Sequence, residues 1–473
     1  MKGSEFVGQI DSMVRISKRF IPWRDYEKIK EDLFIIGKDE DKIMALYREH
    51  SEGLSLPRSY AVQRFGLGRL RDKMSYGSPI TGKFLWSLDE KKRSQLRITG
   101  EIMDYVRPGV GAIAQAPCGF GKTVMAIFCL LEWAVTTVVF VHTEFLAEQW
   151  EETLIEATDL TFKDIGRVQR DRCEFRGKKV VIAITPSVSK AVAGDRKGGD
   201  YPKAFYTHFG CAIFDETHRY GAEKWSQIIG AFPAAYRLGV SATPERKDGM
   251  TPVINHHIGP IASTTLSYQN APTIFSLPYQ AAMPYKSICL WSGGRPSSRV
   301  SLAKIQTRLA KDERRNHILS EILDACIDSG RKTIVFSDRL EQLRTLKRLL
   351  AHRGQGDSEV GFYIGGMKQA QRIESSRKQL ILSTYALGAE GLDIPALDTV
   401  VLATPRANVE QSIGRILREY DNKMAPWVID MADRIASTGL PTILSNKREL
   451  FYESKGWKIR RIMTAELLEA ISG

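Results

Sequence analysis

Short apolar runs alternate with longer segments of helical pattern from about residue 111 to the C-terminal end of the chain. Each run is nearly continuous in Val, Ile, Leu, Phe or Ala, and the segments between them mix apolar and polar positions. Strands that are apolar throughout and separated by helices are typical of parallel sheets covered on both faces. The pattern therefore predicts an α/β protein with ten such strands: Ile113–Ala116, Val138–His142, Val180–Thr185, Cys211–Phe214, Gly239–Ser241, Thr333–Ser337, Val360–Ile364, Leu380–Ser383, Thr399–Ala403 and Trp427–Asp430.

The ten predicted strands fall into two groups of five, which indicates two parallel-sheet domains. The segment between the groups carries Gly293, Gly294 and Pro296, a composition that predicts a linker or a projecting hairpin. Residues before about Phe84 lack the alternation and are expected to form a domain of their own. We therefore expect a small N-terminal α+β domain at 1–80, a first sheet domain at 81–268, the linker or hairpin at 269–300 and a second sheet domain at 301–473.

The strongest local pattern is the run from Ala116 to Thr123, which follows one predicted strand and precedes a predicted helix. Its glycines allow backbone N–H groups to turn toward phosphate oxygens, and the start of the following helix adds its dipole. Lys122 supplies a positive charge for the β- and γ-phosphates, and the hydroxyl of Thr123 can ligate Mg²⁺. We expect this loop to bind ATP through Gly119, Phe120, Gly121, Lys122 and Thr123.

A second pattern lies at the end of the apolar strand Cys211–Phe214, where Asp215 and Glu216 follow each other directly. A carboxylate at a strand end can hold Mg²⁺ through water, and the next one can orient and deprotonate an attacking water molecule. An acidic pair after a strand is also a common helix N-terminus. Its combination with the phosphate loop favours catalysis, with Asp215 at the Mg²⁺ ion and Glu216 as the base.

With these two patterns, the chain resembles the superfamily 2 helicases and translocases over about residues 84–457. The resemblance implies two tandem RecA-like domains, and in the first of them it matches Phe140–Trp150, Thr185–Ser187 and Ser241–Pro244 to family motifs. It implies that Gln95 reads the adenine, although the Lys-Arg-Ser before it matches poorly. It also implies that nucleotide state is relayed to the nucleic-acid side by His218, Ser241 and Thr243.

The resemblance continues through the second predicted domain, at Ile334–Asp338, Thr384–Pro395 and Gln411–Arg418. It implies nucleotide contacts from Gly391, Asp393 and Gln411. The family uses two arginines of the last motif as catalytic fingers, and Arg415 and Arg418, three residues apart, would share one helix face. By the same resemblance a nucleic-acid strand is contacted by Thr143, Thr185 and Thr384, although strand-end threonines are often simple caps.

Further residues are similar to the branch that contains XPB and the phage UvsW-type proteins. They are Leu238–Gly249, Ile258–Pro260, Lys311–Asn316 and Phe451–Tyr452. Thr217 stands where a DEAH box has alanine, and Ser412 stands where arginine is frequent after the glutamine of the last motif. Members of this branch carry a small N-terminal domain that contacts duplex DNA, so we expect one here.

The net charge of +13 and a pI near 9.3 favour a polyanionic partner. Within the N-terminal segment, basic and aromatic residues are interleaved, which suits phosphate contact combined with base stacking. A solvated basic face over a small core has the same composition. We expect DNA contacts from Arg58, Arg64, Phe65, Arg69 and Arg71.

The six cysteines are scattered, without a C-x-x-C pair or zinc spacing, so structural zinc and disulfides are not expected. No secretory signal and no membrane partner are expected either, and we assign the chain to the cytoplasm of a bacterial or infected bacterial cell, as a monomer.

The sequence predicts an ATP-dependent DNA helicase that uses ATP and Mg²⁺ and acts on forks and four-way junctions. A duplex translocase of the restriction-subunit type, which moves without separating strands, is the nearest alternative. An RNA helicase is a second alternative, but the DEAD tetrad and the full glutamine motif usual in that branch are absent. A binding module with an inactive nucleotide site is disfavoured by Lys122, Asp215, Glu216 and Arg418, and a fused nuclease by the lack of a further acidic cluster.

Overall fold

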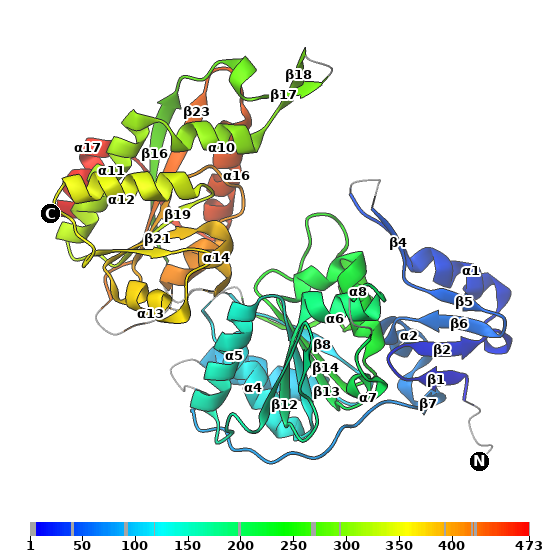
Figure 1. The fold of residues 1–473 in the computed structure, drawn as a ribbon. Coiled ribbons are helices and arrows are strands. Elements are labelled where there is room, and N and C mark those ends of the chain that lie inside the picture. Colours follow the sequence, from blue (N-terminus) through cyan, green and yellow to red (C-terminus); the bar gives the residue numbers. More distant parts are fainter. Residues whose placement is uncertain are drawn as a thin grey trace. The chain divides into compact units, whose positions relative to one another are not determined.

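The structure of the protein is a computed structural model. It describes residues 6–38, 42–88, 93–117, 119–196, 200–265, 271–292, 295–391, 394–417, 420 and 423–472. The chain divides into two compact units, Met1–Ser267 and Tyr268–Gly473, which are described one at a time (Figure 1).

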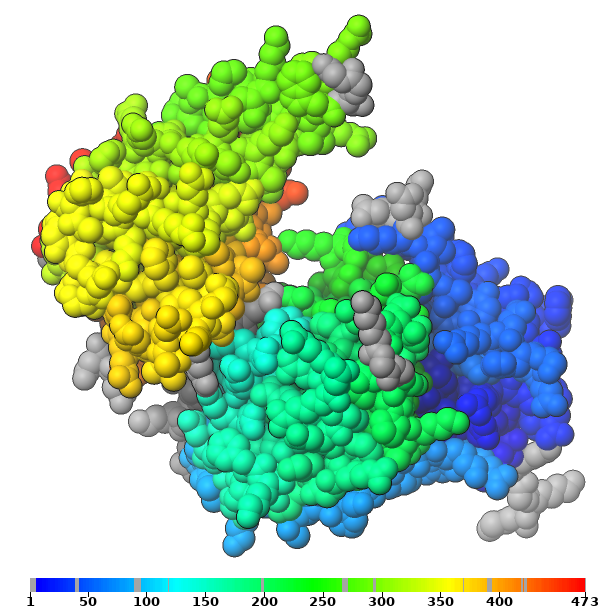
Figure 2. Space-filling model, viewed as in Figure 1, coloured from blue at the N-terminus to red at the C-terminus, as the bar shows by residue number. Residues whose placement is uncertain are grey.

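The N-terminal part of the first unit is a five-stranded sheet in the order β5-β6-β2-β1-β7. Its elements are β1 (Gly8–Ile10), β2 (Val14–Ser17), α1 (Trp23–Asp32), β5 (Arg48–His50), β6 (Gly53–Leu56), α2 (Arg58–Phe65) and β7 (Leu70–Asp72), and a separate ribbon pairs β3 (Phe34–Ile36) with β4 (Ile43–Ala45). Met250 and Val253, which come from the α/β part of the unit, are buried in the same apolar core. Figure 2 shows the blue N-terminal residues lying directly against green residues of that part.

The rest of the first unit is an eight-stranded sheet in the order β11-β10-β12-β9-β13-β14-β8-β15. All neighbouring strands are parallel except β10 and β11. The strands are β8 (Ala112–Gln115), β9 (Thr137–Val141), β10 (Ile165–Gln169), β11 (Arg172–Cys173), β12 (Val180–Ile184), β13 (Cys211–Asp215), β14 (Tyr236–Ser241) and β15 (Ile261–Thr264). The helices are α3 (Arg93–Tyr105), α4 (Lys122–Trp133), α5 (Glu144–Ala157), α6 (Thr185–Val192), α7 (Lys203–Tyr206), α8 (Glu223–Ala231) and α9 (Thr251–His257).

Successive residues of these strands face opposite sides of the sheet, and both sides are apolar. Val139 and Ile213 belong to the core that includes Trp150 of α5. Their neighbours Phe140 and Phe214 belong to the core on the other side, which includes Ile228 of α8. Helices therefore cover the sheet on both faces, and the polar residues that follow the strands gather at its carboxyl edge.

The second unit is a seven-stranded, fully parallel sheet in the order β20-β21-β19-β22-β23-β16-β24. Its strands are β16 (Thr273–Ala281), β19 (Thr333–Ser337), β20 (Val360–Tyr363), β21 (Leu380–Thr384), β22 (Thr399–Leu402), β23 (Trp427–Ile435) and β24 (Lys458–Arg461). Its helices are α10 (Leu302–Ala310), α11 (Glu313–Asp328), α12 (Leu340–His352), α13 (Gln369–Arg377), α14 (Tyr385–Gly391), α15 (Glu410–Gly414), α16 (Leu440–Ser454) and α17 (Thr464–Ser472). A hairpin of β17 (Cys289–Ser292) and β18 (Arg295–Val300) stands apart from this sheet.

The predicted fold class is confirmed: two parallel-sheet α/β domains follow a small N-terminal domain, and all ten predicted strands are present. The predicted linker at 269–300 is wrong in part, because β16 is an inner strand of the second sheet, and only β17 and β18 project. No helix among the described residues combines the length and the apolar character needed to cross a membrane.

Candidate active site

The phosphate loop connects β8 to α4 at the carboxyl edge of the first sheet. Gly119 and Gly121 have φ angles of +79° and +91°, in the left-handed region that favours glycine. A Cβ atom at position 121 would lie 2.6 Å from Nε2 of Gln95, so this glycine also makes room for a neighbour. The amino group of Lys122 donates hydrogen bonds to the carbonyl oxygens of Ala116 and Pro117, at 3.1 and 3.0 Å. Lys122 is thus held at the loop, where it was predicted to bind the phosphates of ATP.

Gln95 of α3 is buried and lies against the phosphate loop. Its side-chain amide donates a hydrogen bond to the carbonyl oxygen of Phe120, and its backbone carbonyl oxygen accepts one from the hydroxyl of Thr99 at 2.7 Å. The structure therefore connects Gln95 to the backbone of the predicted nucleotide site. Its predicted contact with adenine stays a prediction.

Asp215 ends β13 beneath the phosphate loop and is almost fully buried. Its carboxylate accepts hydrogen bonds from the indole N–H of Trp150 at 2.9 Å and from the backbone N–H of Glu216 at 2.8 Å. Burial raises the pKa of Asp215, the neighbouring Glu216 raises it further, and Trp150 and Lys122 oppose this. A divalent cation would relieve the cost of burying this charge. Trp150 is a partner that the sequence analysis missed, because no local pattern pairs it with Asp215.

Glu216 has a φ angle of +47°, which is uncommon for a residue with a side chain. Strained backbone of this kind persists where the surrounding structure fixes it, often at functional sites. The Oε2 atom of Glu216 lies 3.3 Å from Nδ1 of His218. That nitrogen is also 3.1 Å from Oγ of Ser241, which accepts a hydrogen bond from the backbone N–H of Thr243 at 3.2 Å. The structure thus brings together the predicted base and the three predicted coupling residues.

Thr217 explains one departure from the family pattern. Its fully buried hydroxyl lies 2.9 Å from the carbonyl oxygen of Phe214 and 3.0 Å from that of Val240. A Cβ atom at Gly239 would lie 2.7 Å from the same hydroxyl, so the glycine provides the space for the threonine. The hydroxyl ties the ends of β13 and β14 together, next to Glu216 and Ser241.

Arg246 is a second residue whose role the sequence did not reveal. It donates to the carbonyl oxygen of His218, and its Nε atom donates to Asp248 at 3.0 Å. The Arg246 guanidinium is the main cause that lowers the pKa of Asp248 to about 2. The charged element after Ser241–Pro244 is therefore bonded to the backbone two residues from Glu216, the predicted base.

The residues at this edge fit a nucleotide with its magnesium ion. The left-handed glycines open the loop, and the first backbone N–H groups of α4 have no partner within the helix. Lys122 provides the cation, and buried Asp215 provides a hard oxygen ligand of the type that Mg²⁺ prefers. Thr123 begins α4 beside Lys122, where a hydroxyl ligand was predicted.

The three predicted strand-contacting threonines have different environments. Thr143 is the N-cap of α5 and accepts a hydrogen bond from the backbone N–H of Leu146 at 3.2 Å. The prediction for the Thr185 side chain is wrong, because its hydroxyl is fully buried and lies 2.8 Å from the hydroxyl of Tyr220. Thr384 ends β21 in the second unit and is half-buried. Strand contacts by Thr143 and Thr384 stay predictions.

The N-terminal arginines that were predicted to contact DNA differ in their exposure to solvent. Arg58 is only 1% exposed and donates to the carbonyl oxygens of Ala234, at 2.6 Å, and Ala235, at 3.4 Å. The prediction that Arg58 binds DNA is therefore wrong: it fastens the N-terminal sheet to the α/β part of the first unit. The sequence shows a basic residue in a basic stretch and gives no sign of this distant backbone partner.

The remaining predicted DNA contacts of this segment lie nearer the surface. Arg64 forms ion pairs with Asp25 at 3.4 Å and Asp32 at 3.5 Å, so part of its charge is already compensated. Phe65 is half-buried and packs against the N-terminal core. Arg69 and Arg71 are exposed, and they are the residues of this group that stay available as DNA contacts.

Three predicted nucleotide-site residues of the second unit lie on α14, on α15 and in the turn after α15. Gln411 is half-buried, and Arg415 is buried in a 3₁₀ turn that follows α15 directly. Gly391 ends α14. Asp393 and Arg418 lie outside the described residues, and the roles of all five residues stay predictions.

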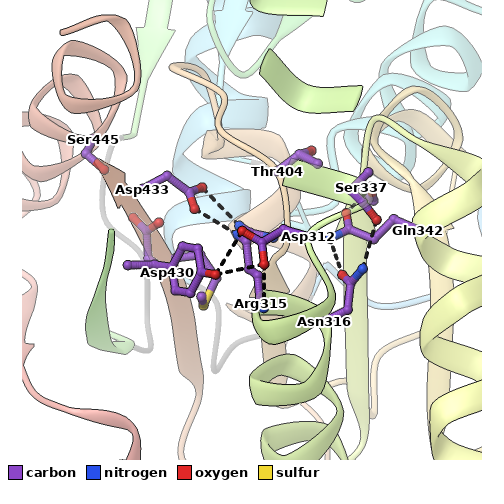
Figure 3. A network of polar contacts seen from close by, with 12 residues as sticks. Asp312, Arg315, Asn316, Ser337, Gln342, Thr404, Asp430, Asp433 and Ser445 are labelled. Carbon is purple, nitrogen blue, oxygen red and sulfur yellow. Dashed lines mark hydrogen bonds and ion pairs between the residues drawn. The ribbon is translucent and has the colours of Figure 1, made fainter. Parts of the chain in front are cut away.

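The second unit contains a buried polar network that includes Arg315 and Tyr452, two of the residues on which the expected XPB and UvsW-type resemblance was based (Figure 3). Arg315 of α11 makes two hydrogen bonds to Asp433 of β23, at 2.7 and 2.9 Å, and neither side chain is exposed. Arg448 of α16 makes an equivalent pair to Asp430, at 2.8 and 2.7 Å, and Tyr452 donates to Asp430 at 2.9 Å. These residues fasten two helices to one strand.

Three polar side chains extend the network toward the end of β19 (Figure 3). Gln342 donates to Oδ1 of Asn316 at 3.0 Å and accepts from the hydroxyl of Ser337 at 2.7 Å. Their pairing orients α11 and α12 around the strand end that leads to Asp338. The similarity in this region therefore reflects the framework of the domain.

Two protein families match separate parts of the chain. The family described as "Type III restriction enzyme, res subunit" matches residues 92–246, and "Helicase conserved C-terminal domain" matches residues 314–419. The first match contains the phosphate loop, the carboxylates and the Ser241 turn. The second contains Arg315, Asn316, Ser337 and Gln342 of the polar network, together with Arg415.

Two viral proteins are similar over most of this chain. A putative ATP-dependent RNA helicase of Acanthamoeba polyphaga mimivirus is 27% identical over 465 residues, covering 96% of this chain and 86% of that protein. A probable helicase of Escherichia phage T5 is 23% identical over 385 residues, covering 78% and 77%. Among solved structures, S. cerevisiae Dbp5 bound to RNA and ADP BeF3 is similar with a TM-score of 0.54 and 16% identity, covering 80% of this chain and 93% of that one.

Proposed function

We propose that the chain, which belongs to superfamily 2 of the helicases, uses ATP hydrolysis to move along DNA and to unwind or branch-migrate forked and four-way-junction DNA. The observation that carries this proposal is the contact between Glu216, His218 and Ser241, because it connects the hydrolytic carboxylate to the turn that follows β14. A nucleotide site that only bound ATP would not need this connection.

In the proposed reaction, bound MgATP supplies the phosphoanhydride bond whose hydrolysis drives movement. Lys122 leaves the carbonyl oxygens of Ala116 and Pro117 and meets the β- and γ-phosphates. Asp215 and Thr123 would hold the magnesium ion, which would neutralise phosphate charge. Glu216 orients the attacking water and accepts its proton, a role that suits a carboxylate held beside Asp215 and His218.

Coupling follows from the shared position of His218. Its Nδ1 atom lies 3.3 Å from Oε2 of Glu216 and 3.1 Å from Oγ of Ser241. A change of charge or position at Glu216 would therefore alter the contact between His218 and the serine. Ser241 in turn holds the backbone of Thr243. We propose that this path reports hydrolysis to the residues that hold the nucleic acid, which include Thr143.

The proposal favours DNA for three reasons. The tetrad is Asp-Glu-Thr-His, not the DEAD sequence usual in RNA-directed members. The N-terminal sheet presents Arg69 and Arg71 at the surface, where duplex arms could be bound. The phage relative is described as a helicase without reference to RNA. We also propose that the chain belongs to the XPB and UvsW-type branch and acts in the cytoplasm of an infected bacterial cell.

RNA unwinding is the second candidate, and one observation favours it. The mimivirus protein, similar over 96% of this chain, is described as a putative RNA helicase. A duplex DNA translocase that leaves strands paired remains the third, and it is supported by the match to a restriction-enzyme subunit.

The test compares substrates side by side. Phosphate release and strand separation are measured on single-stranded DNA, duplex DNA, a DNA fork, a four-way junction and an RNA fork. The proposal requires hydrolysis stimulated by DNA, and separation of the fork and junction. Faster unwinding of the RNA fork would support the second candidate, and hydrolysis on duplex DNA without separation would support the third.

Arg69 and Arg71 provide the test for branch recognition. Truncation at residue 80 would remove Arg58 and expose Met250 and Val253, so it would damage the first unit. Charge reversal is cleaner: Arg69→Glu with Arg71→Glu should reduce fork unwinding more than hydrolysis stimulated by single strands. The control is Lys311→Glu with Arg461→Glu, two residues that are 58% and 64% exposed in the second unit. Equal losses in both double variants would contradict a specific role of the N-terminal sheet.

A further inference from the structure

The hairpin formed by β17 and β18 projects from the second unit (Figures 1 and 2). Cys289 pairs with Val300, Trp291 with Pro296 and Ser292 with Arg295. Among the described strands, the two pair only with each other, so the hairpin has no sheet to support it. An isolated two-stranded ribbon is marginal in water, and its persistence requires an anchor at its base.

That anchor is present where the hairpin leaves the domain. Ile288 and Cys289 are fully buried, and Ile288 belongs to the core of the second unit. The backbone N–H of Ser301 donates to the carbonyl oxygen of Ile288 at 2.8 Å, and the amino group of Lys304 donates to that of Cys289 at 2.8 Å. The two strands therefore leave a fixed base, and their outer residues are held away from the core.

The outer part of the hairpin presents an aromatic ring and two cations to solvent. Trp291 is 54% exposed and its neighbour Leu290 is 43% exposed. Arg295 and Arg299 are both exposed, at opposite ends of β18. Four steps along a regular strand correspond to about 13 Å, and the register shift in this hairpin makes the separation of the two arginines shorter than that. Trp291 pairs with Pro296, so its ring faces one side of the ribbon and Arg295 faces the other. One exposed tryptophan alone identifies no site, but an anchored tryptophan with arginines on the same hairpin is suited to base stacking combined with phosphate contact.

The segment of chain that carries the hairpin has charged side chains of one sign. From Gly249 to Lys311 the chain contains no Asp or Glu, although it holds 55 acidic residues in 473. The hairpin lies within this stretch, which contains six Lys or Arg residues. Such a field attracts a polyanion and repels an acidic protein surface. The occupant that fits both the ring and the charge is a nucleic-acid strand.

We propose that the β17–β18 hairpin contacts the nucleic acid where its strands part, with Trp291 stacked on the exposed base pair and with Arg295 and Arg299 on the flanking phosphates. This inference rests on the proposed function, because it assigns the element that would turn movement into strand separation. The ring takes over stacking that the last base pair loses when its neighbour opens. The arginines keep the displaced strand beside the hairpin.

The experiment measures base pairs separated per ATP hydrolysed on a fork, for the full chain and three variants. Trp291→Ala should lower this ratio by about fivefold or more, the smaller end of what one aromatic stack contributes. Trp291→Phe should retain most of it, because phenylalanine keeps a stacking face. Leu290→Ala is the matched control and should resemble the parent, since it removes an exposed apolar side chain without a ring. A ratio in Trp291→Ala equal to that of the parent would overturn the proposal.

A second measurement does not depend on unwinding. Forks of DNA and of RNA carrying 5-iodouracil at the first unpaired position are irradiated with the parent protein, and the cross-linked peptide is identified. The proposal predicts a cross-link within residues 289–300 for the fork that the protein binds. A cross-link elsewhere, with none in the hairpin, would overturn it and would fit a hairpin that docks another protein. Failure of the proposed function is recognised separately, because the parent would then show no hydrolysis stimulated by either nucleic acid.

Discussion

The Nδ1 atom of His218 lies 3.1 Å from Oγ of Ser241 and 3.3 Å from Oε2 of Glu216, so one imidazole nitrogen contacts both the predicted base and the predicted coupling turn. The three residues come from the ends of the neighbouring strands β13 and β14. Because the strands are parallel and in register, their carboxyl ends meet at one edge. The sheet therefore brings together two motifs that are separated by more than twenty residues.

Ser241→Ala should uncouple hydrolysis from unwinding. The substitution removes the hydrogen bond to His218 and the acceptor for the N–H of Thr243, while Glu216 and the phosphate loop are unchanged. A lost hydrogen bond of about 1 kcal/mol corresponds to roughly a fivefold effect, so base pairs separated per ATP should fall by about that factor. Ser226→Ala is the control. The Ser226 hydroxyl contacts the carbonyl oxygen of Glu223 in its own helix turn and the sulfur of Met44 at 3.9 Å, and neither partner belongs to the predicted nucleotide site. An unchanged ratio in Ser241→Ala would disprove the relay.

Lys122→Ala should remove ATP hydrolysis. Its amino group is held at the phosphate loop by Ala116 and Pro117, and the loss of one charged transition-state contact typically costs on the order of 10²–10³ in rate. Phosphate release measures the effect. Lys178→Ala, which removes a half-buried lysine bonded to the carbonyl oxygen of Lys163, should have the parent rate. Hydrolysis in Lys122→Ala within tenfold of the parent would exclude the loop as the phosphate site.

Arg237→Ala should destabilise the first unit. The fully buried guanidinium donates to the carbonyl oxygens of Ser12, Ile229, Phe232 and His257, at 2.7 to 3.1 Å, and so joins the N-terminal sheet to the α/β part. Leaving several buried carbonyl groups without a donor should cost about 3 kcal/mol or more. Urea unfolding measures the loss.

Arg172→Ala is the control for this prediction. Its guanidinium is exposed and pairs with Glu174, so the substitution should change the free energy of unfolding by less than about 1 kcal/mol. If Arg237→Ala were equally mild, the buried guanidinium would not be what joins the two parts.

His257 should make the stability of the first unit sensitive to mild acid. Burial, with smaller contributions from the nearby Arg237 and His256, lowers the pKa of His257 to about 3. Below pH 6.5 the imidazole of His257 binds a proton in the unfolded chain but stays neutral in the folded chain. The contribution of neutral His257 to the free energy of unfolding is therefore complete above this pH and falls by about 1.4 kcal/mol per pH unit below it. Between pH 7.5 and 5.5, urea unfolding of the parent should therefore lose about 1 kcal/mol more than that of His257→Gln. Equal losses would show that His257 is protonated in the folded protein.

The sequence predicted the parts of the fold that are encoded locally. The ten strands were identified because buried strands are runs of apolar residues. The glycines at 119 and 121 were identified because left-handed backbone favours glycine. β16 was missed because Pro278 and the polar residues Ser276 and Gln280 interrupt its apolar residues. The structure tolerates Pro278 because β24 pairs only with Thr273–Ser276, so the proline lies beyond that neighbour.

The predictions that failed concern partners that are far away in the chain. Arg58 bonds to carbonyl groups about 176 residues later, and Thr185 bonds to Tyr220 across the sheet. The same holds for Trp150, whose indole bonds to Asp215 from another element. A local sequence pattern indicates which interactions a side chain is able to make. The partner that it actually has depends on the tertiary fold.

The most direct test of the account is phosphate release by the parent and by Glu216→Gln, each with and without single-stranded DNA. The account predicts that DNA stimulates hydrolysis by the parent, whereas Glu216→Gln still binds ATP but hydrolyses it about 10² to 10⁴ times more slowly, since only the proton acceptor is lost. Hydrolysis by Glu216→Gln at the parent rate, stimulated by DNA to the same extent, would contradict it.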